Sequence, residues 1–195
     1  MNTRPHYFCF DTETGGLSSS NSLLTLYGLI LDEGFKQIGH IDLTLKPDSG
    51  QYIVEAAAMG INRISLVDHD KNAMPYKKAK ETLYKFLYLY KPLHLIGHNV
   101  AFDVKFVKRH LFGGSRKELD SLFTRHVHDT KNNATFLKTT GLIPEDVGVG
   151  LAQQLKFFFP DIDLSGHHNA EWDAKMTCKL FLAQRELVMR NERQG

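Results

Sequence analysis

The first quarter of the chain has the hydrophobic pattern of β-strands. Apolar and aromatic residues form runs that are bounded by polar, glycine-containing segments. This pattern predicts strands over residues 6–11, 23–31 and 36–46, with a turn at Asp32-Glu33-Gly34 between the last two. Three early strands joined by short turns are typical of an antiparallel meander.

After residue 50 the apolar residues recur mostly at the three- and four-residue spacing of helices. Helices are predicted over residues 53–59, 75–90, 100–112, 147–159 and 169–189, and short strands over 93–97 and, more weakly, 125–129. Strands first, and then strands alternating with helices, predict an α/β fold with a mixed five-stranded sheet flanked by helices. Because no linker or repeat interrupts the pattern, residues 1–195 are expected to form a single domain.

The composition narrows the functional classes. The chain has 195 residues and a net charge of +2, so any affinity for nucleic acid must come from local patches or from a metal ion. Cys9 and Cys178 lie inside predicted elements, which favours reduced thiols. No signal peptide and no apolar run of about 18 residues is found, so a soluble, cytoplasmic protein without a membrane partner is expected.

Two carboxylates, Asp11 and Glu13, end the first predicted strand. If the chain stays extended through Glu13, the period of two places both side chains on one face. Like charges so close are tolerated when they share a cation, and Gly15 and Gly16 allow another backbone segment to approach closely. The alternative is a strand that runs into a polar turn with both acids solvated. This stretch alone leaves the two interpretations level.

Two further carboxylates lie on the apolar stripes of predicted helices. Asp103 shares a face with Phe106 and Val107, although an acid there would also be explained by a turn cap or a lysine partner. Asp173 falls in the first turn of the last helix, where the helix dipole favours an anion. Together the four acids form an oxygen-only set that suits magnesium or manganese. His167 and His168 precede the last helix in a loop.

Three separated motifs contain these acids in order along the chain. They are Asp11-Thr12-Glu13-Thr14-Gly15-Gly16-Leu17, Gly97-His98-Asn99-Val100-Ala101-Phe102-Asp103 and His168-Asn169-Ala170-Glu171-Trp172-Asp173. In order and spacing they resemble the motifs of the DEDD exonucleases. A histidine five residues before the last aspartate resembles the DEDDh branch, which includes proofreading exonuclease subunits, ribonuclease T and oligoribonuclease. This spacing selects His168 over His167.

The resemblance implies a ribonuclease H-like fold and a metal-dependent 3′–5′ exonuclease. Such an enzyme would hydrolyse phosphodiester bonds at the 3′ end of single-stranded or frayed DNA and release nucleoside 5′-monophosphates with two Mg²⁺ or Mn²⁺ ions. Asp11 would bridge the ions, Glu13 and Asp173 would complete one site, and Asp103 would serve the other. His168 would be the general base, because an imidazole suits proton transfer near neutral pH.

The same resemblance implies a substrate cleft. It would be lined by Thr14, Leu17, Met59, His98, Asn99 and Phe102. The expected partner is a nucleic acid with a 3′ end, DNA rather than RNA, together with a polymerase or replication complex. Two positions depart from the family pattern: Met59 stands where a polar residue is common, and Gly15 stands where a threonine is common. Gly15 is expected to loosen the lip formed by residues 14–17.

Three alternatives stay open. The first is a 3′–5′ exoribonuclease of the ribonuclease T kind, since a threonine at position 12 is compatible with either a DNA or an RNA substrate. The second is a nucleic-acid-binding module that has lost catalysis, although the set of four acids and a histidine is complete. The third is a histidine-rich zinc protein, from ten histidines that include His126, His128, His167 and His168. It ranks low because no cysteine–histidine set has structural-zinc spacing.

Overall fold

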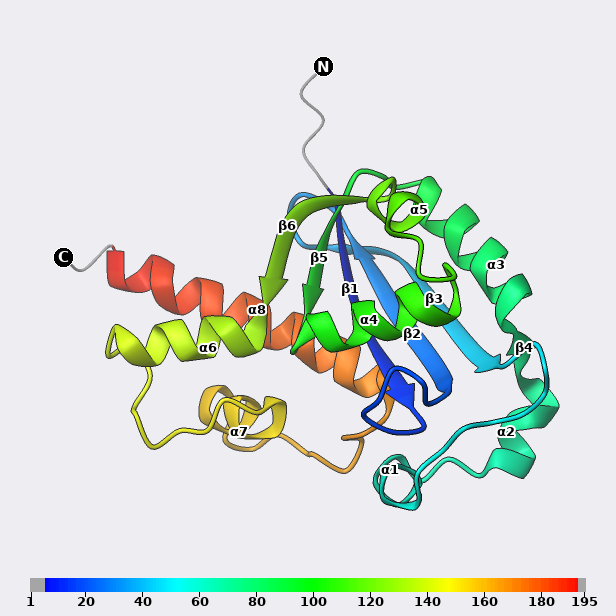
Figure 1. Ribbon diagram of the computed structural model, residues 1–195. Helices are drawn as coiled ribbons and strands as arrows, with labels where there is room; N and C mark the ends of the chain where they lie inside the picture. The colour runs from blue at the N-terminus through cyan, green and yellow to red at the C-terminus, as the bar shows by residue number, and fades with distance from the viewer. Residues whose placement is uncertain (1–5, 193–195) are drawn as a thin grey trace.

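The computed structural model describes residues 6–192 and contains one mixed sheet (Figure 1). Its strands are β1 (His6–Thr14), β2 (Leu23–Leu31), β3 (Gln37–Lys46), β4 (Met74–Pro75), β5 (Leu93–Gly97) and β6 (Phe123–Asp129). They lie in the order β4-β3-β2-β1-β5-β6. β1, β2 and β3 pair antiparallel, which confirms the predicted meander, while β5 and β6 run parallel to β1 and to each other. The expected α/β fold with a mixed sheet is therefore confirmed.

The sheet has one strand more than the five expected. This strand, β4, consists of two residues that pair parallel with Leu45 and Lys46 at the end of β3. A two-residue strand is too short to produce an alternating pattern in the sequence. β1 extends to Thr14, so the acids at its end belong to the strand itself.

Helices cover both faces of the sheet. They are α1 (Ala56–Asn62), α2 (Leu66–Asn72), α3 (Tyr76–Tyr88), α4 (Val100–His110), α5 (Arg116–Asp120), α6 (Thr130–Thr139), α7 (Leu151–Phe158) and α8 (Ala170–Glu192). The sequence pattern did not predict α2, α5 and α6. α7 begins at Leu151 rather than at residue 147, since Gly148 and Gly150 precede it in non-helical backbone.

The hydrophobic core is divided between the two faces. On one face Phe8 and Phe10 of β1 pack with buried residues of α3 and α4. On the other face Cys9 of β1 packs with Ala174 and Phe181 of α8. Alternate residues of β1 thus face α4 and α8, and the two helices cross opposite sides of the strand that ends in the carboxylates (Figure 1).

Both cysteines are free thiols, as expected for a reduced protein. The buried Cys9 Sγ donates a hydrogen bond to the carbonyl oxygen of Ala174 in α8, at 3.4 Å. Within residues 6–192, no helix is both long enough and apolar enough to span a bilayer.

Candidate active site

The end of β1 brings three carboxylates together. Asp11 and Glu13 project toward the α8 face, and Asp173 lies in the first turn of α8. One carboxylate oxygen from each of the three lies within 4.8 Å of the others. The acids are not a solvated turn, because Asp173 is 5% exposed and Asp11 and Glu13 are half-buried, and this group could hold a metal ion.

The fourth carboxylate reaches the site from α4. Asp103 is 3% exposed and shares the buried stripe of α4 with Phe106 and Val107, as the helical projection predicted. Its Oδ1 accepts two hydrogen bonds from Thr12, one from the backbone N–H at 3.0 Å and one from the hydroxyl at 2.6 Å. Thr12 lies between Asp11 and Glu13 in the sequence, so these hydrogen bonds hold Asp103 beside the two acids.

Burial and mutual repulsion raise the pKa values of these acids. Burial, followed by the charges of Asp103 and Asp173, raises the pKa of Asp11 well above its ordinary value. Burial and the neighbouring acids raise the pKa of Glu13 to about 7. Burial raises the pKa of Asp103 to about 7 against the two bonds from Thr12, which lower it. Like charges that raise one another's pKa values are typical of functional sites, and this cluster is a candidate metal site.

The two histidines before α8 have different orientations. The Nδ1 atom of His167 lies 2.7 Å from Asp173 Oδ1, whereas the backbone N–H of His168 donates to Asp173 Oδ2 at 3.0 Å. The ring of His168 is exposed and stacks on that of His167, with centroids 3.9 Å apart. His168, the histidine selected by motif spacing, thus borders the acids without contacting them through its ring. His168 has a left-handed backbone, with φ 68°.

Gly15 tightens the lip, so the expectation that it loosens the lip is wrong. A Cβ at Gly15 would lie 2.6 Å from the carbonyl oxygen of Ile53. Only glycine allows this approach, in which the Glu55 N–H donates to the Gly15 carbonyl and the Ser22 N–H donates to that of Ile53. The close approach of a second backbone segment, which the two glycines predicted, is confirmed.

The residues expected to line the cleft fall into two groups. Leu17 is 79% exposed in the loop after β1, and Lys105 Nζ lies 3.4 Å from its carbonyl oxygen and 5.7 Å from the Phe102 ring. Met59 is half-buried on α1. Thr14 and His98 are engaged internally, whereas Asn99 is exposed. The Thr14 hydroxyl donates to the Gly16 carbonyl, and His98 Nδ1 lies 2.9 Å from the Thr130 hydroxyl.

The β5–α4 junction is fixed from β6. Asn99 has a left-handed backbone, with φ 62°, and its own side chain does not cap α4. Instead the carboxylate of Asp129 accepts hydrogen bonds from the N–H groups of Asn99 and Val100, each at 3.0 Å. Asp129 also accepts from Lys131 and Asn132 at the start of α6. It thus sets the position of α4 and of the Asp103 carboxylate.

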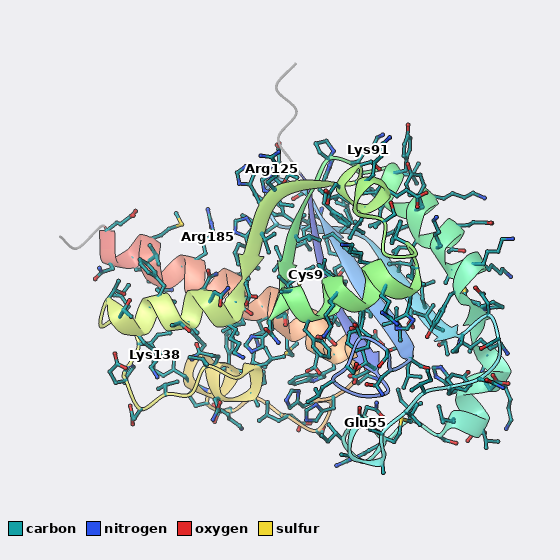
Figure 2. The ribbon with its side chains drawn as sticks, in the orientation of Figure 1. Cys9, Glu55, Lys91, Arg125, Lys138 and Arg185 are labelled. Carbon is teal, nitrogen blue, oxygen red and sulfur yellow. The ribbon has the colours of Figure 1, made fainter. Side chains whose placement is uncertain are left out.

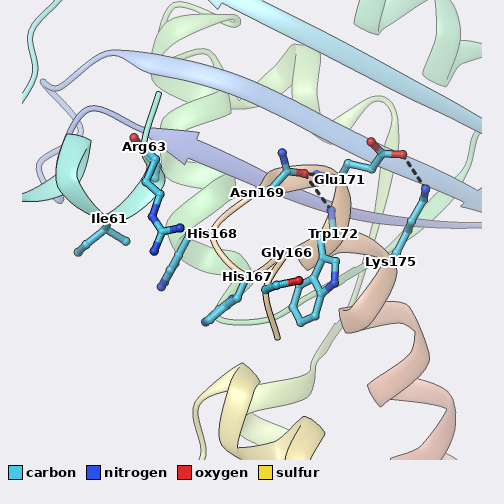
Figure 3. A pocket seen from close by; sticks show the side chains of 11 residues that line it. Ile61, Arg63, Gly166, His167, His168, Asn169, Glu171, Trp172 and Lys175 are labelled. Carbon is cyan, nitrogen blue, oxygen red and sulfur yellow. Dashed lines mark hydrogen bonds and ion pairs between the residues drawn. The ribbon is translucent and has the colours of Figure 1, made fainter. Parts of the chain in front are cut away.

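A pocket of about 480 Å³ lies next to the acids, between the end of α1 and the loop before α8 (Figure 3). Arg63, which follows α1, extends toward His168. Burial, then the charge of His167 and to the least extent that of Arg63 lower the pKa of the His168 imidazole. Within residues 6–192 no carboxylate pairs with Arg63. On the other side of the pocket Lys175 is neutralised by Glu171, at 2.6 Å.

The model of an exonuclease family (RNase_T) matches residues 8–181. The chain belongs to this exonuclease family. Its motifs and its fold identify it with the DEDDh 3′–5′ exonucleases, so the predicted resemblance and the predicted enzyme class are confirmed.

Curated relatives of this exonuclease include PolC-type DNA polymerases III. That of Lactococcus lactis subsp. lactis is 34% identical over 187 residues, which cover 95% of this chain and 10% of the relative. That of Streptococcus pneumoniae serotype 4 is 30% identical over 176 residues, which cover 90% of this chain and 11% of the relative. The chain therefore spans about a tenth of the length of these polymerases.

Solved structures of exonuclease I have the same fold. The Escherichia coli enzyme in complex with a dT13 oligonucleotide aligns with a TM-score of 0.74 and 17% identity, over 93% of this chain and 40% of that one. Exonuclease I from Methylocaldum szegediense aligns with a TM-score of 0.75 and 16% identity, over 94% of this chain and 41% of that one. At this level of identity the likeness establishes the fold of the exonuclease.

From the sequence, no role at the site was assigned to four residues that the structure places there. Thr12 and Asp129 position the acids, His167 contacts Asp173, and Arg63 borders the pocket. The orientation of Thr12 was predictable from the strand alternation, because its side chain must point to the opposite face of the sheet from those of Asp11 and Glu13. The other three depend on backbone turns whose conformation the local sequence does not determine.

Proposed function

We propose that this exonuclease requires divalent metal ions and shortens single-stranded or frayed DNA from its 3′ end, releasing nucleoside 5′-monophosphates. The observation that carries the proposal is the convergence of Asp11, Glu13, Asp103 and Asp173 at the end of β1, with His168 in the adjoining loop. The family gives the class of reaction, and this cluster supplies the groups that the reaction needs.

The donor set fits two hard divalent ions. All four side chains offer carboxylate oxygens, the ligands that Mg²⁺ and Mn²⁺ prefer. The raised pKa values of Asp11, Glu13 and Asp103 indicate repulsion that bound cations would relieve. Bound divalent ions would stabilise negative charge on the phosphoryl group and make a bound water more acidic. Asp11, Glu13 and Asp173 would hold one ion, and Asp11 with Asp103 the other.

His168 is the proposed general base. Burial and the neighbouring His167 lower the pKa of His168, so its imidazole is neutral near pH 7 and is able to accept a proton. Its ring is exposed and stacks on His167, so rotation of the side chain would bring it over the acids when substrate is present. The backbone bond from His168 to Asp173 keeps the loop in place during that rotation.

The terminal nucleotide is proposed to lie between the lip and α4. Leu17 offers an exposed apolar side chain, and Phe102, beneath Lys105, offers a ring against which a base stacks. Thr14, Met59, His98 and Asn99 complete this wall, Thr14 mainly through backbone groups because its hydroxyl is engaged with Gly16. Such contacts involve base faces and phosphates, so they give little selectivity for base sequence.

DNA is the proposed substrate and a polymerase the proposed partner. In support, the curated relatives are DNA polymerases, and exonuclease I has been solved with dT13 and dA16 oligonucleotides. Because the chain corresponds to about a tenth of the PolC-type polymerases, we propose that residues 1–195 act as one exonuclease domain that trims the 3′ end for a polymerase.

Product analysis on matched oligonucleotides tests the proposal. DNA and RNA strands of one sequence, labelled at the 5′ end, would be incubated with Mg²⁺, Mn²⁺ or a chelator. The expected result is stepwise shortening of the labelled DNA from its 3′ end, with 5′-monophosphates released and no reaction in chelator. Asp11→Asn should abolish the reaction, whereas Asp68→Asn, at an exposed acid on α2, should not. Faster loss of RNA would replace the proposal with an exoribonuclease.

A further inference from the structure

The loop before α8 places two imidazoles beside the carboxylate of Asp173. His167, His168 and Asp173 each offer one ligand atom, and these atoms lie within 4.8 Å of one another. We propose that these three residues form a binding site for zinc or a similar borderline divalent ion, distinct in its donors from the oxygen site of Asp11, Glu13 and Asp173. The two sites share Asp173, so they compete for this carboxylate.

The donor chemistry separates the two sites. Imidazole nitrogen with one carboxylate is typical of zinc coordination, whereas all-oxygen sets suit magnesium and manganese. Two histidines and one acid supply three protein ligands and leave one tetrahedral position for water. Motif spacing singles out only His168, so the nitrogen-rich site depends on the additional histidine at position 167.

The geometry requires small adjustments to hold an ion. Zn–N and Zn–O bonds of about 2.0–2.2 Å at a tetrahedral angle place the donors roughly 3.3 Å apart. The distance of 2.7 Å between His167 Nδ1 and Asp173 Oδ1 must therefore open by about 0.6 Å. The two rings are inclined by only 21°, so their lone pairs do not yet converge, and the His168 ring must turn about its side-chain bonds.

The loop is built to present both histidines at this spot. The His167 N–H donates to the Leu164 carbonyl, and the His168 N–H donates to Asp173 Oδ2. The Trp172 ring lies so close to Gly166 that a Cβ there would be 2.2 Å from it, and the same ring borders His167 at 5.7 Å. The backbone is thus fixed while the exposed His168 ring is free to turn, so ion binding needs little reorganisation.

Occupation of this site would inhibit the exonuclease, a consequence that rests on the proposed function. A zinc ion there withdraws Asp173 from the oxygen site and His168 from proton transfer. The binding of zinc itself does not rest on that function.

The closing experiment measures binding of Zn²⁺ alone to the full chain by equilibrium dialysis, and the visible absorption of the Co²⁺ form. His167→Asn is expected to weaken zinc affinity by about tenfold or more and to reduce the tetrahedral Co²⁺ bands. Glu13→Gln should weaken Mn²⁺ binding and leave zinc affinity within about threefold of the wild type. His126→Asn is the matched control, because His126 is an exposed histidine of β6 that lies near His94. It should change neither zinc affinity nor Mn²⁺ binding.

Two results would contradict the proposed zinc site. One is unchanged zinc affinity in His167→Asn. The other is an equal loss in Glu13→Gln or in His126→Asn, which would place the zinc in the oxygen site or in the histidine cluster of β5 and β6. With Mg²⁺ and DNA present, zinc should slow the wild type and slow His167→Asn only at about tenfold higher concentration. Failure of the wild type to cut any oligonucleotide would contradict the proposed function and leave the binding result intact.

Discussion

Thr12 illustrates how a residue between two ligands positions a third. Its hydroxyl and its N–H both donate to Asp103 Oδ1, and the hydroxyl bond at 2.6 Å joins two buried groups. Thr12→Val keeps the shape and removes that donor. We expect a loss of about 1–2 kcal/mol in unfolding free energy, measured by denaturant titration, because a buried carboxylate loses a hydrogen bond. Activity should fall because Asp103 loses its fixed position. Thr12→Ser retains the donor and should preserve both, and an active, fully stable Thr12→Val enzyme would contradict this role.

Arg63 supports a prediction about phosphate binding. Its charge lies at the pocket beside His168 without an acidic partner among residues 6–192, whereas Lys175 in the same pocket is paired with Glu171. If Arg63 binds a phosphate of the strand, Arg63→Ala should raise KM for DNA several-fold. It should also lower the slope of log affinity against log salt by about 0.7, the value of one contact to a single strand.

Lys175→Ala is the matched control for this charge. It removes a cation from the same pocket, but Glu171 already neutralises that cation, so the salt slope should stay near the wild-type value. Binding titrations at several salt concentrations measure both variants. Equal slopes for Arg63→Ala and the wild type would exclude a phosphate contact.

At the scale of elements, Asp129 joins β6, α6 and α4. Its carboxylate accepts from four backbone N–H groups, those of Asn99, Val100, Lys131 and Asn132. Asp129→Ala leaves two helix starts without these acceptors, and we expect a loss of about 2–3 kcal/mol in unfolding free energy. For a chain of this size that corresponds to a Tm lower by roughly 5–10 °C, measured by calorimetry. Asp129→Asn keeps one acceptor oxygen, so its Tm should lie between those of the wild type and Asp129→Ala. A Tm for Asp129→Ala equal to that of the wild type would refute this role.

The two helices that begin at this junction, α4 and α6, differ in whether the sequence pattern predicts them. The strands and α4 have strong apolar periodicity, so their positions and the inward face of Asp103 followed from it. α6 was missed because it has a polar, asparagine- and threonine-rich sequence in which only Thr130, Ala134 and Leu137 are buried. Its start is stabilised by the Asp129 cap and by packing on α8, and neither produces a periodic signal.

At the scale of the molecule, separate segments meet at one end of β1. The four acids were predictable because a strand end and two helix faces have regular geometry. The orientation of the His167 and His168 rings was not, since it depends on the left-handed backbone at His168 and on the packing of Trp172 against Gly166. Outside the site, the labelled Lys91 and Arg125 lie at the opposite end of the sheet, so the acids are not neutralised by these cations (Figure 2).

This acidic end couples the stability of the whole molecule to pH and to metal. The pKa of Glu13 is raised from 4.5 to about 7, mainly by burial and by the charges of Asp173 and Asp103. A raised folded-state pKa means that the folded protein binds the proton more tightly than the unfolded chain does. The stability contributed by protonated Glu13 is therefore complete below about pH 4.5 and is lost as pH rises through 7.

Glu13→Gln isolates this contribution, because glutamine does not ionise. Without metal, the variant should match the wild type near pH 4 and exceed it at pH 8 by on the order of 1–2 kcal/mol, a value reduced for the partial exposure of Glu13. With Mn²⁺ the order at pH 8 should reverse, because the wild type gains a ligand-bound folded state that the variant binds less well. Chemical unfolding at both pH values, with chelator or with Mn²⁺, measures the four differences. If, without metal, the stability difference between the wild type and Glu13→Gln were the same at pH 8 as at pH 4, the raised pKa of Glu13 would be refuted.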